Sequence, residues 1–372
     1  MIWLWIGFIA FIIVLLVVDL GVIHRGAHTV SPASAMRWVA FFIALGLVFN
    51  VAVYFIYQHD WLGFGSSFTN ALRLAAADEV VQAGGIKPEQ MGSWQPPAGS
   101  VAAREIAAPG LTAALQFLTG WLTEYALSID NIFVIAVVFG HFRVPAQYQH
   151  RVLFWGILGA LVMRGAMILG GTTLIARFHW LLYVFGAFLI LTAIKLAISR
   201  EDKQEDFEKR PLIRGLRKLV PVSSGFDGQK FLTRLSTGAL AATPLLLVLI
   251  IVEATDLVFA LDSIPAILGI TTDPFLVFTS NVFAILGLRS LFFALSGMMS
   301  KFEYLKYSLA AILGFVGAKM LLEMPVFDVE IPAAVSLGVI AGALGIGVGA
   351  SLWHARRQSG AAPAGRRNSH RS

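Results

Sequence analysis

Long apolar stretches repeated along the chain constrain its fold more than any other feature. A helix needs about 20 apolar residues to cross a bilayer, because each residue rises only about 1.5 Å. Charged residues make up only 13% of the 372-residue chain, against about 25% in soluble domains. The sequence therefore predicts an all-α, polytopic membrane protein with about nine transmembrane helices. The expected spans are residues 2–23, 36–57, 112–140, 152–175, 180–198, 239–268, 276–298, 303–323 and 331–352.

The distribution of positive charge predicts how these spans are oriented. Lys and Arg are enriched in loops on the cytoplasmic side of a membrane. Nine of them lie in residues 199–234, between the fifth and sixth spans, and five arginines follow the last span. The alternate loop 271–274 has none. We therefore expect the N-terminus outside the cell and the C-terminus in the cytoplasm.

Changes in hydropathy divide the chain into seven segments. Spans three to five and spans six to eight form two units on either side of a basic loop. We expect the weakly hydrophobic segment before the first unit to be a solvated insertion outside any functional site. The segments are 1–58 (helices 1 and 2), 59–110 (extracytoplasmic insertion), 111–199 (helices 3 to 5), 200–237 (cytoplasmic basic loop), 238–324 (helices 6 to 8), 325–353 (helix 9) and 354–372 (disordered cytoplasmic tail).

The two three-span units resemble each other. The motif "LSIDNIFV" of the third span is answered by "FALDSIPA" of the sixth, and a further acid precedes each motif aspartate by six residues. A unit with an odd number of spans makes the next unit enter the membrane from the opposite side. We therefore predict a 3+3 inverted repeat, which many secondary transporters use to bind cargo near the bilayer midplane. The matched pairs are Asp130 with Asp262, Glu124 with Asp256, and Arg164 with Arg289.

Five acidic residues lie well inside the third and sixth spans. A carboxylate at the centre of a membrane helix costs about 2.5–3.5 kcal/mol, so a cation, a proton or a countercharge must compensate each one. Arg164 and Arg289 are the expected countercharges. Two arginines cannot pair with all five acids, so some acids need another compensating group. The predicted metal ligands are Glu124, Asp130, Glu253, Asp256 and Asp262, with Ser128, Asn131 and Ser263 as supporting ligands.

These side chains predict a site for a hard divalent cation. Carboxylate, amide and hydroxyl oxygens suit Mg, Ca or Mn, whereas imidazole and thiolate suit Zn or Cu. No histidine lies near either acidic motif and the chain has no cysteine, which argues against the softer metals and against thiol chemistry. The alternative is that the acids are salt-bridged to the arginines and only hold the helices together.

The spacing of the acids restricts how one helix can present them. Residues six apart on a straight helix are separated by about 9 Å along the axis and about 240° around it. Glu124 and Asp130 therefore cannot share one face of an unbroken helix. Pro265 in the sixth span also removes an amide donor. Either both helices are broken near their acids, as in many transporters, or the sixth span has an ordinary proline kink.

Three segments, "DLGVIHRGAH", "FLTGWLTEYALSIDNIFV" and "EATDLVFALDSIPAIL", resemble signature segments of the TerC family, integral membrane proteins named for tellurium resistance. The likeness runs from about residue 19 to residue 323, and the chain departs from the pattern in its enlarged outside segment and its C-terminal span. The resemblance implies a bacterial cytoplasmic-membrane protein with three-helix repeats that exports manganese. It also implies a cation-binding role for the five acids.

The leading prediction is a secondary transporter that exports Mn²⁺ or a similar divalent cation, with protons in exchange. We expect contact with the lipid bilayer and with membrane-protein partners, and no enzyme activity, cofactor or nucleic-acid partner. The chain lacks a P-loop and the Gly-x-Gly-Asp element of intramembrane aspartyl proteases. A membrane scaffold of a stress-resistance or secretion complex, which transports nothing, is the remaining alternative.

Overall fold

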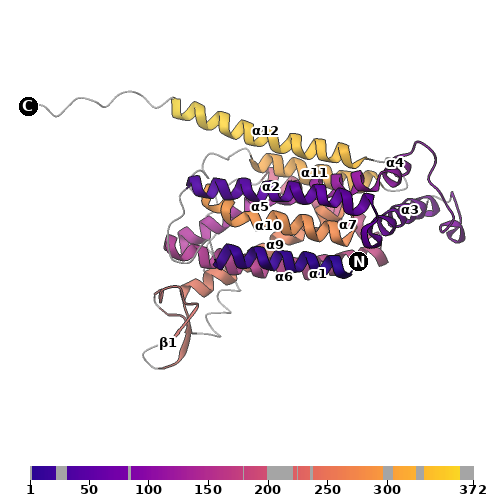
Figure 1. Cartoon of the computed structure of the whole chain (residues 1–372). Helices are drawn as coiled ribbons and strands as arrows, with labels where there is room; N and C mark the ends of the chain where they lie inside the picture. Colours follow the sequence, from indigo (N-terminus) through magenta and orange to yellow (C-terminus); the bar gives the residue numbers. More distant parts are fainter. Residues whose placement is uncertain are drawn as a thin grey trace, which may run out of the picture.

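Long helices that run side by side make up most of the described part of the chain (Figure 1). The computed structural model describes residues 2–21, 32–82, 85–178, 180–198, 221–223, 225–234, 238–295, 305–323 and 331–360. The nine long helices, called the bundle below, are α1 (Ile2–Gly21), α2 (Pro32–Gln58), α5 (Pro109–His141), α6 (Ala146–Arg177), α7 (Leu181–Ile198), α9 (Pro244–Leu268), α10 (Pro274–Leu295), α11 (Leu305–Leu322) and α12 (Ala333–Gly360). The all-α fold class is confirmed.

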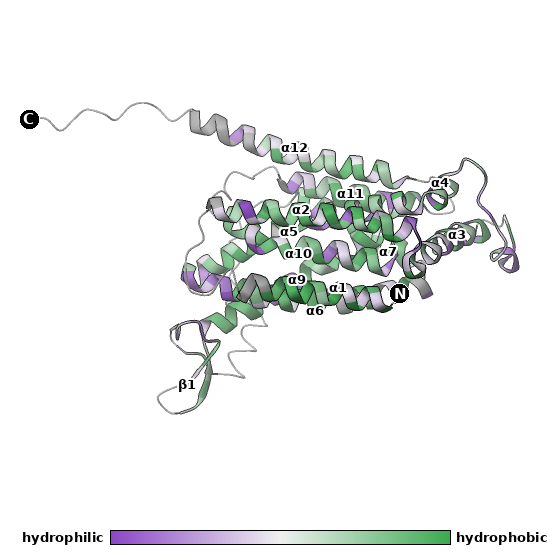
Figure 2. Cartoon of the chain, in the orientation of Figure 1, coloured by the Kyte–Doolittle hydropathy of each residue, from purple (hydrophilic) through white to green (hydrophobic). Residues whose placement is uncertain are grey.

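The apolar composition of the bundle fits a membrane. Seven of the helices in the described ranges are long and apolar enough to cross a bilayer, namely α2, α5, α6, α7, α9, α10 and α12. The first helix, α1, has a shorter apolar stretch, Ile2–Val17, and α11 coincides with the expected span 303–323. Figure 2 shows hydrophobic residues along the bundle and many of the hydrophilic ones toward its ends. Each expected span therefore falls on a helix, while the total of nine crossings stays a prediction.

The two ends of the bundle carry different small elements (Figure 1). Short helices cover the end where α1 begins, and a two-stranded antiparallel sheet projects from the end where α12 finishes. The termini of the bundle thus lie at opposite ends, as an odd number of crossings requires, and the side of the membrane that each faces stays a prediction. The small elements are η1 (Trp61–Gly63), α3 (Phe64–Gln82), η2 (Pro88–Gln90), α4 (Val101–Ala107), β1 (Leu232–Arg234) and β2 (Leu240–Ala242).

Helix α10 is the most enclosed of the seven candidate spans. In its apolar window 94% of the residues are buried, against 17% in α7. It packs against α2, α5 and α6, and α1 contributes ring contacts such as that of Trp5 with Phe275, whose centroids are 5.2 Å apart. Polar side chains on α10 are therefore shielded from lipid by protein.

The two predicted units pack across each other. Helix α5 lies against α10, α6 lies against α9, and α7 lies against α11. The last pair approaches closely, because a Cβ atom on Gly317 would lie only 2.7 Å from the carbonyl oxygen of Gly186. This exchange of partners is what an approximate twofold relation between the units would produce, although the inverted repeat itself stays a prediction.

Of the two alternatives left open for the acidic helices, the break in both is wrong. Helix α5 continues past Glu124 and Asp130, and α9 runs without interruption from Pro244 to Leu268 with Pro265 inside it. A proline removes only its own amide donor, and Pro265 lies in the last turn, where its carbonyl still accepts from the amide of Gly269 at 3.0 Å. Acids six residues apart on these helices therefore face different neighbours.

Two of the predicted segments contain helices that their hydropathy did not indicate. The predicted insertion 59–110 contains two α-helices, because its sequence supports short helices without being apolar enough for a span. Helix α12 continues to Gly360, so the first residues of the predicted disordered tail are helical. Residues 361–372 of that tail and residues 199–220 of the basic loop lie outside the described residues.

Candidate functional site

Arg164 of α6 lies at the centre of a buried polar network. Its side chain is 2% exposed. The Nη2 and Nε atoms donate to the two carboxylate oxygens of Asp256 on α9, at 2.8 and 3.1 Å, and Nη1 donates to Oε1 of Glu124 on α5. The planar guanidinium suits this two-point contact with a carboxylate. One arginine therefore joins three helices and opposes two acids.

Asn281 of α10 completes this network and was missed by sequence reasoning. It is 1% exposed, its Oδ1 accepts from Nη1 of Arg164 at 3.2 Å, and its Nδ2 donates to Oε2 of Glu124 at 3.3 Å. The hydroxyl of Ser263 lies 3.4 Å from the same Nη1 atom. The available signal was an amide in the middle of the seventh span, since a buried amide needs partners.

Three of the predicted ligands have a buried oxygen with no hydrogen-bond partner among the described residues. These oxygens are Oγ of Ser128, Oδ1 of Asn131 and Oε2 of Glu253. The amide nitrogen of Asn131 donates to Oδ1 of Asp256 at 3.4 Å, which holds this side chain at the edge of the network. Buried acceptors without donors are costly, and a bound cation is one group that would satisfy them.

Glu253 precedes Asp256 by about one helical turn, so both acids lie on similar faces of α9. Its carboxylate lies against the backbone of Gly159 on α6, where a Cβ atom would overlap both carboxylate oxygens. The glycine therefore makes room for a further acid on α9, about one turn from Asp256.

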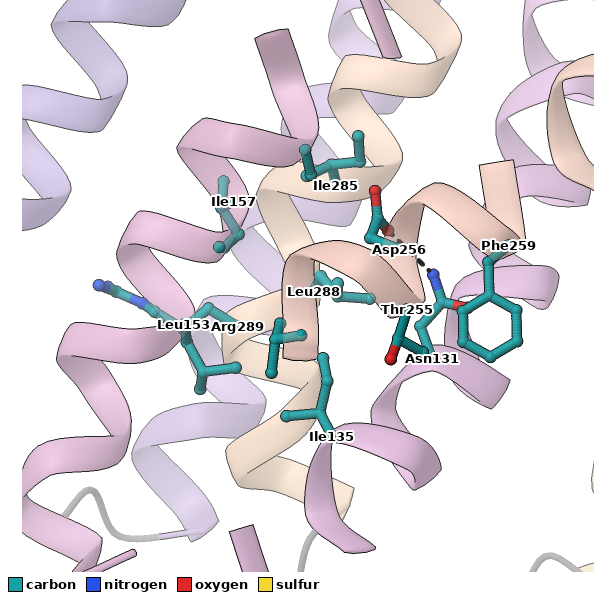
Figure 3. A pocket seen from close by; sticks show the side chains of 13 residues that line it. Asn131, Ile135, Leu153, Ile157, Thr255, Asp256, Phe259, Ile285, Leu288 and Arg289 are labelled. Carbon is teal, nitrogen blue, oxygen red and sulfur yellow. Dashed lines mark hydrogen bonds between the residues drawn. The ribbon is translucent and has the colours of Figure 1, made fainter. Parts of the chain in front are cut away.

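A small cavity adjoins the network on the side of Asp256 (Figure 3). Its volume of about 30 Å³ is enough to hold water. Asn131 and Asp256 line one side, and most of the remaining lining is apolar. Arg289 also lines the cavity, and in Figure 3 its guanidinium points away from Asp256 and Asn131.

The predicted acids do not all meet at one point. Asp262 accepts a hydrogen bond at 3.3 Å from the hydroxyl of Thr192 on α7, away from the Arg164 network. Asp130 belongs to α5, but its side chain lies outside the described residues. In the part of the chain that the structure describes, no three acidic, histidine or cysteine side chains are grouped closely enough to hold a metal. Among the described residues, a cation site would therefore combine two carboxylates with amide and hydroxyl oxygens.

The end of α10 nearest α3 is fixed by Asp273, just outside the span. Its Oδ1 accepts from the backbone amides of Phe275 and Leu276 at 2.9 and 3.0 Å, and from the hydroxyl of Tyr57 at 3.0 Å. This is the N-cap pattern, with Pro274 at the first helical position. Burial raises the pKa of Asp273, and the hydrogen bonds from Leu276, Tyr57 and Phe275 oppose that rise. The cap positions the helix that carries Asn281.

Comparison with known proteins gives one consistent family. The model described as "Integral membrane protein TerC family" matches residues 110–359, which includes α12, a helix that the motif-based likeness left out. "Uncharacterized membrane protein STKORF319" of Myxococcus xanthus is 47% identical, over 95% of this chain and 93% of its own. Proteins named "Putative membrane-bound redox modulator Alx" from Salmonella typhi and Escherichia coli K12 are each 42% identical, over 94% and 92% of this chain and 94% and 91% of their own. These matches also extend across residues 59–110, so the insertion is not peculiar to this chain. No solved structure matches.

Proposed function

Because the chain belongs to the TerC family of integral membrane proteins, we propose that it is a secondary transporter that exports a divalent cation, first of all Mn²⁺, across the bacterial cytoplasmic membrane. The observation that carries this proposal is the set of buried oxygens at the Arg164 network. Two carboxylates, Glu124 and Asp256, meet there inside the bundle. Asn131, which donates to Asp256, has a buried amide oxygen without a partner among the described residues.

The chemistry of these oxygens supports a hard cation. Carboxylates, the amide oxygens of Asn131 and Asn281, and the hydroxyl of Ser263 belong to the ligand types that Mg²⁺, Ca²⁺ and Mn²⁺ prefer. Two carboxylates balance the charge of one divalent ion. A site with few charged ligands also releases its ion readily, which transport requires and permanent storage does not. Protons are the proposed exchange partner, since carboxylates can take up a proton as the metal leaves.

Two of the relatives are named as membrane-bound redox modulators, and this name also bears on the proposal. This chain has no cysteine, so a redox role of its own could not use thiols. Moving a redox-active metal across the membrane would alter redox balance without any thiol in the transporter. Cation export is therefore compatible with such a role.

Mn²⁺ flux into proteoliposomes tests the proposal. We expect Asp256→Asn and Glu124→Gln to reduce flux by at least about tenfold, because removing a single charged ligand costs at least about 1.4 kcal/mol of binding. Asp130→Asn and Asp262→Asn test whether the remaining motif acids belong to the path. The matched control is Asp227→Asn, which makes the same change at a half-exposed turn beside Lys230. Equal flux in the wild type and all four site variants would contradict the proposal.

A membrane scaffold that transports nothing is the second candidate. The observation in its favour is that Arg164 links α5, α6 and α9 through Glu124 and Asp256, as a purely structural ion-pair network would. In that case the wild type shows no cation flux, and the same substitutions lower only the thermal stability of the purified protein.

A further inference from the structure

The guanidinium of Arg164 lies among oxygens of the kind that would hold a cation. Its Nη1 atom contacts Glu124 Oε1, Asn281 Oδ1 and Ser263 Oγ, and its Nη2 atom contacts Asp256 Oδ1. These four oxygens come from α5, α9 and α10, so three helices converge on one positive group. We propose that Arg164 is an internal competitor of the transported cation, and that the two occupy these oxygens in turn. The inference rests on the proposed function and names the regulation of that site.

Charge balance makes the two occupancies exclusive. Glu124 and Asp256 together carry two negative charges, which one divalent ion neutralises. With Arg164 still in place, the same oxygens would face three positive charges in a buried setting, where water screens repulsion poorly. Arg164 must therefore leave before the cation is fully bound. When the cation departs, the arginine restores part of the neutralisation, so the carboxylates are never left without a countercharge inside the bundle.

The unpartnered oxygen of Asn131 is an independent observation that points to a ligand. Asn131 is 4% exposed, lines the cavity and keeps its amide nitrogen on Asp256, while its Oδ1 atom has no hydrogen-bond partner among the described residues. Arg164 donates to both oxygens of Asp256 but not to this atom. A cation that approaches Asp256 from the cavity would gain the Asn131 oxygen as a ligand that the arginine does not use.

The cavity also lies within reach of the arginine. Gly156 and Ala160 of α6 line it, and they precede Arg164 by eight and four residues, which places them on the same face of the helix. Helical side chains lean toward the N-terminal turn, so Arg164 leans toward this cavity. The cavity can thus receive the incoming cation with part of its water, or the displaced guanidinium.

Equilibrium binding of Mn²⁺ to the purified full-length protein tests the competition. We expect Arg164→Gln to bind Mn²⁺ at least about tenfold more tightly than the wild type, because close buried charge pairs are worth more than the 1.4 kcal/mol that a tenfold change represents. The matched control is Arg177→Gln, the same change on the same helix at an exposed arginine, about 20 Å further along the axis. It should bind as the wild type does. Unchanged or weaker binding by a folded Arg164→Gln protein would overturn the inference.

A second variant covers the case in which Arg164→Gln does not fold. Arg164→Lys keeps one positive charge but lacks the planar fork that makes a two-point contact with Asp256 while it reaches Glu124, so we expect Mn²⁺ affinity between those of the wild type and Arg164→Gln. In Arg164→Ala, added methylguanidinium should fill the vacated position and weaken Mn²⁺ binding in a competitive manner, with no such effect on the wild type. Affinity of Arg164→Lys at or below the wild-type value, or methylguanidinium that leaves Mn²⁺ binding unchanged in Arg164→Ala, would also contradict the competition.

Flux separates this inference from the proposed function. If Arg164→Gln binds Mn²⁺ more tightly but the wild type shows no flux, the competition is supported and the transporter proposal is contradicted. If the wild type shows flux but Arg164→Gln does not bind Mn²⁺ more tightly, the competition is contradicted and the transporter proposal is supported. Absence of Mn²⁺ binding in every protein, at concentrations that saturate the flux assay, overturns both.

Discussion

Asp256 and Asp262 lie six residues apart on α9 but have different surroundings. Asp256 receives two hydrogen bonds from Arg164, a full positive charge. Asp262 accepts one hydrogen bond from the neutral hydroxyl of Thr192. The 240° rotation between them on an unbroken helix turns one toward α6 and the other toward α7. The group that compensates a carboxylate on a membrane helix therefore depends on which neighbouring helix that face of the helix contacts. Two acids in one motif need not belong to one site.

Removing the guanidinium of Arg164 should have the largest effect on stability, because Asp256 would then lose its countercharge. Arg164→Gln leaves Glu124 and Asp256 buried without their countercharge, which costs about 3–5 kcal/mol for a buried pair. We expect a marked fall in the thermal unfolding temperature in detergent. Arg177→Gln, at the exposed end of the same helix, should change stability by less than about 0.5 kcal/mol. Equal effects of the two substitutions would show that Asp256 does not depend on Arg164.

Glu253, a further acid of α9, can be crowded by a substitution on α6. Gly159→Ala forces the Glu253 carboxylate out of its place, and overpacking of this kind costs about 1–3 kcal/mol. Gly170→Ala on the same helix meets nothing within 4 Å and should gain up to about 1 kcal/mol of helix propensity. Thermal unfolding checks the two signs, and Mn²⁺ flux should fall only in Gly159→Ala. The essential result is that Gly159→Ala lowers the unfolding temperature while Gly170→Ala raises it.

Asp273 offers a pH-dependent comparison, since it is a buried acid with only neutral donors. Because burial raises its pKa in the folded protein, its contribution to stability is full below the ordinary pKa of Asp, about 3.9, and is lost as the pH rises through the raised value. Asp273→Asn keeps an N-cap acceptor and should remove this pH dependence. Asp273→Ala should cost about 0.5–2 kcal/mol. A stability profile of Asp273→Asn with the wild-type slope in this range would contradict the assignment.

Removing the partner of Asp262 should give the smallest effect. Thr192→Val deletes one long hydrogen bond, 3.3 Å, from a neutral hydroxyl to a carboxylate that is partly exposed. Because both its length and its exposure weaken this bond, we expect a loss below about 1 kcal/mol. Thr173→Val, which removes an exposed hydroxyl bonded to a backbone carbonyl, is the control. A loss as large as that of Arg164→Gln would mean that Asp262 is as tightly compensated as Asp256.

These contacts show which features of the fold and of the site could be predicted from the sequence. Span positions followed from apolar length, and Arg164 followed from the need to compensate buried acids. The choice of partner did not follow, because Arg164 reaches Glu124 and Asp256 only through the packing of α5, α6 and α9. Asn281 was missed because a single amide without a repeated motif gives a weak signal. The alternative of broken helices gave Pro265 too much weight, since a proline in the last turn of a helix disturbs few hydrogen bonds.

The burial of α10 has a consequence for how the protein is made. Its partners α2, α5 and α6 all precede it in the chain, so the surfaces that enclose it exist before it leaves the ribosome. A span that carries Asn281 and Arg289 is poorly suited to lie alone in lipid. When the helices are made in this order, the most enclosed span enters a place that is already lined by protein. A chain permuted to begin at α10 would lose that protection during insertion.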